Sequence, residues 1–437
     1  MTLQSSKHNI ISAITGTQKY IIVNVLSENA DVISDYDLSC LKAPYLDNIP
    51  SEFIEKGYVV NPLEEEMRFR MKYIDYLEQR DNEEMQLFFI PTYGCNFTCS
   101  YCYQSEYPHI KQDIGKDVID AFFNFITHQF SNRKKYITLF GGEPLLPSIS
   151  HKENIAYFLN RLKQDQLEVA VVTNGYSLDG YLELFDNTFT REIQITLDGT
   201  EEIHNQRRKL KNSQGTFAQI VKNIDACLEK KIQVNLRMVI DKENITYLPD
   251  LAAFAIEKGW TGNPFFKSQI GRNYELHYCQ NGQSKLFDRL SLYQALYDTI
   301  KRYPHVTRFH KPAFSVMKFL QENGNLPNPL FDACPACKSE WAMDFSGNIY
   351  PCTATVGKPE ELLGTFYPEI KLQESKIKTW QQRDVLKIEN CKDCKVQLIC
   401  GGGCGSIAYN QNKHIHSTDC RPVADLIGLG ASAYFIR

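Results

Sequence analysis

The stretch Pro91-Thr92-Tyr93-Gly94-Cys95-Asn96-Phe97-Thr98-Cys99-Ser100-Tyr101-Cys102-Tyr103 holds three cysteines in the spacing C-x3-C-x2-C, directly after an apolar run at Met85–Ile90. Three thiolates on one short loop can hold three irons of a [4Fe-4S] cube and leave the fourth iron open to a ligand that is not protein. An open iron can bind and reductively activate that ligand, whereas a fully ligated cluster only passes electrons. This spacing therefore favours a reactive iron-sulfur site.

A structural zinc site is the alternative for these cysteines. It needs a fourth Cys or His close by, and His109 lies too far along the chain to complete a compact zinc knuckle. The chain has fourteen cysteines in all. In a cytoplasmic protein thiols stay reduced, so clustered cysteines indicate metal binding rather than disulfides.

The composition limits the class of protein. A chain of 437 residues predicts two or three domains. A formal charge of -4 gives no support for nucleic acid as the main partner. No run of about eighteen apolar residues occurs, and the N-terminal residues lack the basic start and apolar core of a signal peptide. We therefore expect a cytoplasmic protein with no membrane partner.

Strand and helix patterns alternate through the middle of the chain, which predicts a parallel sheet with helical crossovers, as an open or complete barrel. The strand candidates are residues 85–90, 136–139, 168–173, 192–197 and 233–240. The helix candidates between them are residues 117–129, 154–164 and 217–230. Ligands of such sheets bind at the carboxyl ends of the strands.

The first eighty residues carry no chemical motif. Short strands are expected at 20–25, 30–34 and 58–60, and helices at 37–42 and 50–56. This order predicts a small α+β module that resembles part of a winged helix, and a plain N-terminal structural cap is equally open. An amphipathic linker helix is expected at 64–80.

Polar motifs follow three of the predicted strands. They are Gly141-Gly142-Glu143-Pro144, Thr173-Asn174-Gly175 and Thr196-Leu197-Asp198-Gly199, and the segment Glu202-Ile203-His204-Asn205-Gln206-Arg207-Arg208 comes next. Glycine at a strand end lets the backbone approach a ligand closely. Each motif alone is also compatible with an ordinary turn, and an arginine on a helix is more often simply exposed.

In this order and spacing, the cysteine loop and the strand-end motifs resemble the radical S-adenosylmethionine (SAM) superfamily. The resemblance implies a partial (β/α)6 barrel and SAM bound through its amino and carboxylate groups to the open iron. It implies that GGEP contacts the methionine amino group, that the next two motifs line the ribose and methionine parts, and that Arg208 pairs with the SAM carboxylate. Asn205 replaces the usual Asp of the family. The implied SAM contacts are Tyr101, Gly141, Gly142, Glu143, Pro144, Thr173, Asn174, Thr196, Asp198 and Arg208.

A second field of cysteines resembles the SPASM extension of this superfamily. Cys337 is followed by nine residues, Gly347, four residues and Cys352; later come C-x2-C-x5-C-x3-C from Cys391 and a lone Cys420. The resemblance implies two further [4Fe-4S] clusters, three in all. It assigns Cys334, Cys337, Cys352 and Cys404 to auxiliary cluster I, and Cys391, Cys394, Cys400 and Cys420 to auxiliary cluster II.

Two points about these cysteines stay open. The close spacing of Cys334 and Cys337 departs from the sulfatase-maturase relatives, so Cys334 is the least certain ligand, and without it auxiliary cluster I would have an open iron. A zinc ribbon is the alternative for the two C-x2-C pairs. Cys40, Cys227 and Cys279 are left over as ordinary thiols.

The resemblance implies an enzyme that acts on peptides, with three parts at residues 1–80, 81–310 and 311–437. We expect hydrogen abstraction from a ribosomally made precursor peptide and an intramolecular cross-link, with the leader bound by the N-terminal module and electrons from a flavodoxin or ferredoxin. The alternative is a sulfatase maturase. It is disfavoured because Thr353 occupies the position at which such enzymes carry an Asp that acts as a base. Asp344 is a weak candidate base, with a solvated loop acid as the simpler interpretation. A non-catalytic iron-sulfur electron carrier is the alternative of another class.

Overall fold

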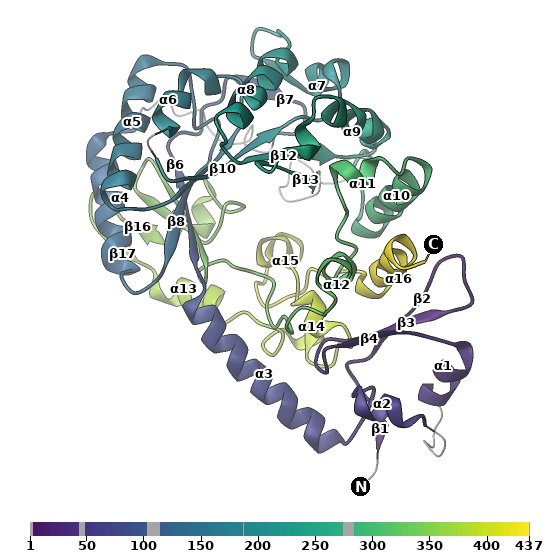
Figure 1. Ribbon diagram of the computed structural model, residues 1–437. Coiled ribbons are helices and arrows are strands. Elements are labelled where there is room, and N and C mark those ends of the chain that lie inside the picture. The colour runs from purple at the N-terminus through teal and green to yellow at the C-terminus, as the bar shows by residue number, and fades with distance from the viewer. Residues whose placement is uncertain (1–2, 43–48, 103–113, 187, 274–283, 437) are drawn as a thin grey trace.

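The computed structural model describes residues 3–42, 49–102, 114–186, 188–273 and 284–436. His109 and Cys279 lie outside these ranges. The main feature is a ten-stranded sheet in the order β13-β12-β10-β9-β8-β6-β14-β15-β16-β17 (Figure 1). Its six barrel strands are β6 (Met85–Ile90), β8 (Lys135–Leu139), β9 (Val169–Thr173), β10 (Thr190–Thr196), β12 (Val234–Ile240) and β13 (Phe266–Arg272). These strands are parallel throughout, so the predicted partial barrel is confirmed.

Helices cover the outer face of the barrel (Figure 1). The principal ones are α4 (Lys116–Gln129), α5 (Ile149–Gln164), α8 (Phe217–Glu229), α9 (Leu248–Glu257) and α10 (Arg289–Arg302), with short α6 (Leu182–Phe185) and α11 (Val306–Phe309) between. Phe89 of β6 packs against Phe122 of α4 and Phe158 of α5, with ring centroids 4.7 and 4.8 Å apart. Strand alternation sends apolar side chains outward into this core and leaves Gln194, Arg237 and Lys267 facing the lumen.

Five strands of the sheet, β13 to β17, were not among the sequence candidates. β13 alternates half-buried and exposed residues because it is the edge of the barrel, which hides the usual apolar signal. β14 (Glu340–Asp344) pairs in parallel with β6 and continues through the antiparallel strands β15 (Asn348–Tyr350), β16 (Gly364–Thr365) and β17 (Lys371–Leu372). The cysteine-rich part thus shares one sheet with the barrel, and the boundary near residue 310 stays a proposal.

The N-terminal module has the expected α+β composition. Its elements are β1 (Gln4–Ser5), β2 (Ile10–Ala13), β3 (Tyr20–Asn24), β4 (Asn29–Ile33), α1 (Asp35–Lys42), α2 (Ser51–Glu55) and β5 (Val59–Val60). β2, β3 and β4 form an antiparallel sheet, and β1 pairs with β5. The 21-residue helix α3 (Pro62–Asn82) begins at the Asn61 cap and runs from this module to the barrel (Figure 1).

The last helix joins the two ends of the chain. α16 (Val423–Tyr434) packs on β2 and β3, beside α10 and α12 (Met317–Asn323). Ser12 donates a hydrogen bond to the carbonyl of Ala424 at 2.7 Å. The other helices of this part are α13 (Glu374–Gln381), α14 (Gln397–Cys400) and α15 (Gly405–Asn412). Within the described ranges, none of the helices is both long and apolar enough to span a bilayer.

Candidate functional site

The cysteine loop is held by a short strand pair at the carboxyl end of the barrel. β7 (Phe97–Cys99) pairs antiparallel with β11 (Arg208–Leu210), and Cys99 lies directly opposite Arg208. Burial raises the pKa of Cys99, and the Arg208 charge opposes that rise. Burial chiefly, with the Glu143 carboxylate, raises the pKa of Cys95 to about 12. These thiols need a cation, either the guanidinium or a metal, to become thiolates.

Arg208 is the arginine that has donors left for a ligand. Its Nη1 donates to the Tyr101 hydroxyl at 2.6 Å, while its Nε is buried without a partner. The neighbouring Arg207 is already neutralised by Asp198 at 3.3 Å and Asp241 at 3.0 Å. A buried guanidinium N–H is rarely left unpaired, and it matches a carboxylate best. The geometry beside Cys99 therefore fits the SAM carboxylate.

A chain of hydrogen bonds fixes the backbone of Arg208. The Asp198 N–H donates to Nδ1 of His204 at 3.2 Å, so the proton of the neutral imidazole is on Nε2 and is donated to Thr216 at 3.0 Å. Thr216 in turn donates to the Arg208 carbonyl at 2.6 Å. Burial lowers the pKa of His204 well below its usual value, which keeps the ring neutral. His204, in the middle of α7 (Glu201–Arg207), thus positions Arg208.

Asn205 has a role that the sequence did not reveal. Its Oδ1 accepts from the N–H of Thr216, the residue before α8, at 2.7 Å and from the N–H of Phe217, the first residue of α8, at 3.0 Å. This is a helix cap supplied from a distant segment. Only an acceptor oxygen is needed, so Asn can replace the usual Asp here without loss of the contact.

The two glycines of GGEP approach protein backbone. A Cβ on Gly142 would lie 2.1 Å from the Gly94 carbonyl oxygen, and one on Gly141 would lie 2.7 Å from that of Thr92. The amide of Gly142 donates to the Thr92 carbonyl at 3.1 Å, and the amide of Glu143 donates to the Gly94 carbonyl at 2.8 Å. The glycines therefore let this loop pack on the segment before Cys95, and their approach to a ligand stays a prediction.

Glu143 joins two of the strand-end motifs. Its Oε1 accepts from the Thr173 hydroxyl at 2.6 Å and the Leu145 N–H at 2.9 Å, and its Oε2 accepts from the Asn174 N–H at 2.7 Å. Asn174 donates onward to Asn96 at 2.8 Å, within the cysteine loop. Burial raises the pKa of Glu143, and these bonds oppose the rise. Pro144 follows directly and its carbonyl contacts His151.

Two other residues implied as SAM contacts lie at the end of β10. The side chain of Thr196 is on the lumen face of the strand, in register with Arg237 of β12. Asp198 is fully buried, and its carboxylate is engaged by Arg207 and by the Val239 N–H at 3.0 Å. Its side chain stabilises the barrel rim, which leaves it little capacity for a ligand.

The C-terminal cysteines fall into two sets, and within each set the thiols raise the pKa of their neighbours. The thiol of Cys334 raises the pKa of Cys337, Cys352 and Cys404, in each case after the larger effect of burial. Around Cys391, burial first and then the thiols of Cys400, Cys394 and Cys420 raise its pKa to about 11. These influences place Cys334 near the other three thiols of the first set, while the assignment of the two sets to auxiliary clusters stays a prediction.

The fit to iron-sulfur clusters rests on this grouping. Among the described residues, no three His, Cys, Asp or Glu side chains converge closely enough for a single metal ion. The thiolates of a cube bind separate irons and stand farther apart than the four ligands of one zinc. Of the left-over thiols, Cys227 is fully buried in α8 and Cys40 is half-buried on α1.

A buried charge cluster holds the two cysteine sets together. Arg383 is completely buried and donates to Asp332 at 3.1 Å and to the carbonyls of Gly402 and Gly403 at 2.7 and 3.1 Å. Lys338 pairs with the other oxygen of Asp332 at 2.5 Å. Because Gly402 and Gly403 lie between Cys400 and Cys404, this arginine fixes the loop that links both sets.

Asp344 is not the solvated loop acid that the sequence suggested as the simpler interpretation. It ends β14, is 1% exposed, and accepts from the Tyr93 hydroxyl at 2.6 Å and from the Ser346 and Asn348 amides at 2.9 and 3.1 Å. Burial raises its pKa. These bonds tie the strand end to the segment before Cys95, and a role of Asp344 as a base stays a prediction.

Glu340 is a carboxylate that the sequence analysis missed. Its Oε1 accepts from the Thr353 N–H at 3.1 Å, directly after Cys352. Burial raises the pKa of Glu340, and the bonds from Thr353 oppose the rise. Thr353 itself has no carboxylate, and the fold places that of Glu340, on β14, beside its backbone amide. No sequence pattern indicates this contact, because the two residues are brought together only by the fold.

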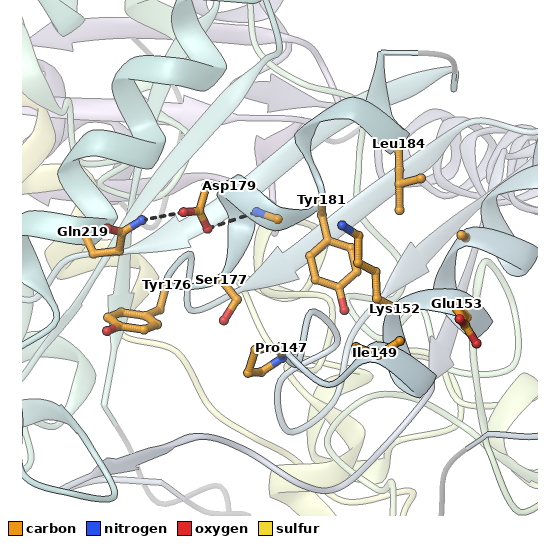
Figure 2. Close-up of a pocket in the computed structure, with 12 residues that line it drawn as sticks. Pro147, Ile149, Lys152, Glu153, Tyr176, Ser177, Asp179, Tyr181, Leu184 and Gln219 are labelled. Atoms are coloured by element: carbon orange, nitrogen blue, oxygen red, sulfur yellow. Dashed lines mark hydrogen bonds between the residues drawn. The ribbon is translucent and has the colours of Figure 1, made fainter.

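Two cavities adjoin these motifs. One, of about 730 Å³, lies outside the barrel between α5 and the segment after β9, where Tyr181, Lys152 and Asp179 line it (Figure 2). It contains none of the cysteines. The other, of about 380 Å³, lies in the barrel lumen and is lined by Phe140, directly before GGEP, and by Thr353, directly after Cys352. The lumen cavity therefore borders a residue next to each of the two motifs.

Comparison with known proteins agrees with this geometry. Residues 89–255 match the family model described as the radical SAM superfamily. The chain is therefore an enzyme that contains a radical SAM domain. A cysteine-type anaerobic sulfatase-maturating enzyme of Clostridium novyi is 24% identical over 71% of this chain and 85% of its own. A serine-type anaerobic sulfatase-maturating enzyme of Bacteroides thetaiotaomicron is 22% identical, over 78% of this chain and 86% of the length of that enzyme.

Solved structures share the fold of this radical SAM enzyme beyond its barrel. The native anSMEcpe structure with bound AdoMet matches with a TM-score of 0.62 and 17% identity, over 81% of this chain and 97% of its own. Streptococcus suis SuiB bound to S-adenosylmethionine matches with a TM-score of 0.54 and 14% identity, over 97% of this chain and 100% of the SuiB chain. The similarity of fold thus extends well beyond the residues that match the family model.

Proposed function

We propose that this radical SAM enzyme modifies a ribosomally made precursor peptide and installs an intramolecular cross-link. The observation that carries the proposal is the pairing of Cys99 with Arg208, whose Nε is buried and unpaired. When bound, a reduced cluster and SAM supply a 5'-deoxyadenosyl radical that takes a hydrogen atom from the substrate. Cys95, Cys99 and Cys102 would hold that cluster, Arg208 the SAM carboxylate, and Glu143 the amino group.

Peptide as the substrate class is supported by the fold. SuiB has also been solved bound to the precursor peptide SuiA, and its fold matches 97% of this chain. That share leaves about 13 residues outside the match, so it includes most of the N-terminal module. We propose that this module binds the leader of the peptide at a sheet edge. A small electron carrier such as flavodoxin or ferredoxin would supply the electrons.

The two C-terminal cysteine sets would hold auxiliary clusters that accept an electron. Forming a bond from a substrate radical requires the loss of one further electron and a proton, so an electron acceptor near the lumen is needed. Cys352 precedes Thr353, which lines the lumen cavity. The set with Cys334, Cys337, Cys352 and Cys404 is therefore the nearer acceptor, and the set with Cys391, Cys394, Cys400 and Cys420 would relay the electron outward.

The first test is SAM cleavage by cysteine variants after anaerobic reconstitution. Cys99→Ala should abolish 5'-deoxyadenosine formation, while Cys394→Ala should stop peptide modification and leave some cleavage. Cys40→Ala is the matched control and should retain both, because this thiol lies on α1, outside the proposed sets. Unchanged product formation by Cys394→Ala would contradict the role of the second set. An enzyme with three intact clusters that forms no 5'-deoxyadenosine would reject the function itself.

The second test identifies the product by mass spectrometry of a peptide encoded beside the gene and co-expressed with the enzyme. A cross-link removes two hydrogens and blocks fragmentation between the joined residues. Epimerisation leaves the mass unchanged and would contradict the cross-link. Oxidation of a serine to an aldehyde also removes two hydrogens, so an aldehyde-specific reagent must fail to label the product.

Sulfatase maturation is the second candidate, because the curated relatives reported above carry that name. The Thr353 substitution argues against it, while the carboxylate of Glu340 beside the Thr353 amide at 3.1 Å gives the position an acid from another strand. A labelled aldehyde on a peptide with a sulfatase-type Cys or Ser would favour this candidate. Absence of label together with a cross-linked precursor would exclude it.

A further inference from the structure

The lumen cavity has an electrostatic character of its own. Its walls include Phe88 and Phe140, whose rings meet edge to face at 5.8 Å, and the charged residues Arg191, Glu192, Arg237 and Lys267. A polar lumen in a packed barrel is costly unless its groups find partners. The partners of each charged group therefore indicate what the cavity is built to receive.

All but one of these charges are already neutralised. Lys267 pairs with Glu192. Arg191 pairs with Glu84 at 2.7 Å and with Glu168 at 3.5 Å, at the opposite end of the strands from the cysteine loop. A further carboxylate of the lumen face, that of Glu340, accepts from the Thr353 amide. Each of these acids thus has a hydrogen-bond donor, and among the charged residues that line the cavity Arg237 is the one for which no ion pair is found in the described part of the chain.

Arg237, the cation without an ion pair, lies in the middle of β12. Its Nε is buried with no hydrogen-bond partner, and in the part of the chain that the structure describes its guanidinium forms no ion pair. The side chain lies flat against Gly271 of β13, where a Cβ would come within 2.6 Å of Nε. A glycine at this register position leaves the space that the guanidinium occupies.

A second unsatisfied atom lies on the same face of the same strand. Asn235, two residues before Arg237, donates to Glu192 at 3.3 Å, but its Oδ1 is buried without a partner. The strand therefore presents an unpaired cationic donor and an unpaired acceptor to one side. A peptide segment with an acidic side chain offers the complement of both, a carboxylate for the guanidinium and an N–H for the amide oxygen.

The position of Arg237 suits a substrate-binding role. It is level with Thr196 at the end of β10 and lines the cavity together with Phe140 and Thr353. A group held there would lie between the cysteine loop and Cys352. SAM has its own candidate arginine, Arg208, whose unpaired Nε is beside Cys99.

From this geometry we infer that Arg237 binds the carboxylate of an Asp or Glu side chain of the peptide substrate and thereby selects acidic sequences. The inference rests on the proposed function, because it names the substrate class of the same cavity. Arg237 would be a specificity-determining residue, and Gly271 and Asn235 would complete its subsite.

The test is a selection of short randomised peptides on the anaerobically reconstituted, SAM-loaded enzyme, read by sequencing the retained peptides. The wild-type protein should enrich Asp or Glu at one position. Arg237→Gln should reduce that enrichment by roughly tenfold to a hundredfold, and Arg237→Glu should enrich Lys or Arg instead. Arg237→Lys keeps the charge and should retain part of the preference. Equal acidic enrichment by wild type and Arg237→Gln, or none by wild type, would overturn the inference.

Two controls keep the result specific. Arg191→Lys changes another cation of the same cavity but keeps its ion pairs, so the acidic preference should persist. The affinity for SAM, measured by equilibrium dialysis, should be the same in wild type and Arg237→Gln, and a tenfold loss would assign Arg237 to SAM and overturn the inference. The selection requires no turnover, so a failure of the proposed reaction, seen as no 5'-deoxyadenosine, is separate from a failure of this subsite.

Discussion

His8 illustrates how single buried residues set the response of this protein to pH. Its ring is 2% exposed, stacks on Phe69 with centroids 5.5 Å apart, and has neither nitrogen hydrogen-bonded. Burial, followed by the charge of Lys7, lowers its pKa from 6.5 to about 4. The folded chain therefore holds this histidine neutral at a pH where the unfolded chain would protonate it.

We predict that His8→Phe makes the protein less sensitive to acid. Between the two pKa values the unfolded state binds the extra proton, so the stability from neutral His8 is complete above pH 6.5 and is lost as pH falls toward 4. The full difference corresponds to about 3 kcal/mol. Urea unfolding of both proteins from neutral to acidic pH measures it, and other histidines such as His310 cancel in the comparison. Parallel curves for the two proteins would contradict the prediction.

Gly142→Ala should disrupt the cysteine loop although Gly142 is not a ligand. Its Cβ would lie 2.1 Å from the Gly94 oxygen, so the two loops must separate and lose the hydrogen bonds between them. We expect a loss of about 1–3 kcal/mol in unfolding free energy and less iron bound per chain. Gly180→Ala is the matched control, since nothing lies within 4 Å of its Cβ. Equal iron content in both variants would refute this.

At the scale of elements, the helix α16 connects the N-terminal module to α10 and α12 by packing against both. Gly428 allows the helix to approach β2 so closely that a Cβ would lie 2.5 Å from the Ala13 carbonyl oxygen. Ser432 donates to the Thr15 carbonyl at 3.1 Å, at the other end of the same contact. The module that we propose to bind the leader is therefore anchored by residues more than 400 positions away in sequence.

Gly428→Ala should loosen this contact selectively. The added methyl forces α16 away from β2, with a cost of about 1–3 kcal/mol. Hydrogen exchange should rise in Ile10–Ala13 and Tyr20–Asn24, while exchange in the barrel strands stays unchanged. Gly262→Ala, with open space around its Cβ, is the control. Uniform exchange across the chain in both variants would show that the contact does not anchor the module.

At the scale of the whole molecule, the Arg383 cluster links the cysteine sets, and Tyr73 connects it to α3. The Tyr73 hydroxyl donates at 2.8 Å to Asp384, the next residue after Arg383. Arg383 itself makes hydrogen bonds to Asp332 and to four backbone carbonyls. Removing one member of such a buried network leaves the other charges unpaired.

Arg383→Gln should therefore lower the unfolding free energy of the metal-free protein by about 3–5 kcal/mol. It should also reduce the iron retained by the C-terminal part, because the loop between Cys400 and Cys404 loses its support. Arg70→Gln is the control, since Arg70 and Glu66 form an exposed helical pair of the kind that contributes about 0.5 kcal/mol or less. Similar urea midpoints for the two variants would contradict this role for Arg383.

The sequence by itself determined the chemistry and the repeating architecture. The spacing of Cys95, Cys99 and Cys102 and the motifs at strand ends are local patterns, and the alternation of strands and helices implies parallel pairing with few alternatives. The α+β composition of the N-terminal module and α3 also followed from periodicity. β13 did not, because an edge strand lacks a continuous apolar run.

Only the tertiary structure decided which groups meet. Arg208 lies opposite Cys99, whereas Arg207 forms ion pairs with Asp198 and Asp241. This difference depends on the strand register, which the sequence does not define. The close packing of Gly142 on Gly94 and the buried state of Asp344 depend on contacts between distant segments. The unpaired guanidinium of Arg237 is visible only after every neighbouring acid has been given its partner. The spacing of residues in the sequence encodes the local chemistry. Complementarity to a substrate depends instead on the buried donors and acceptors that have no partner within the folded chain.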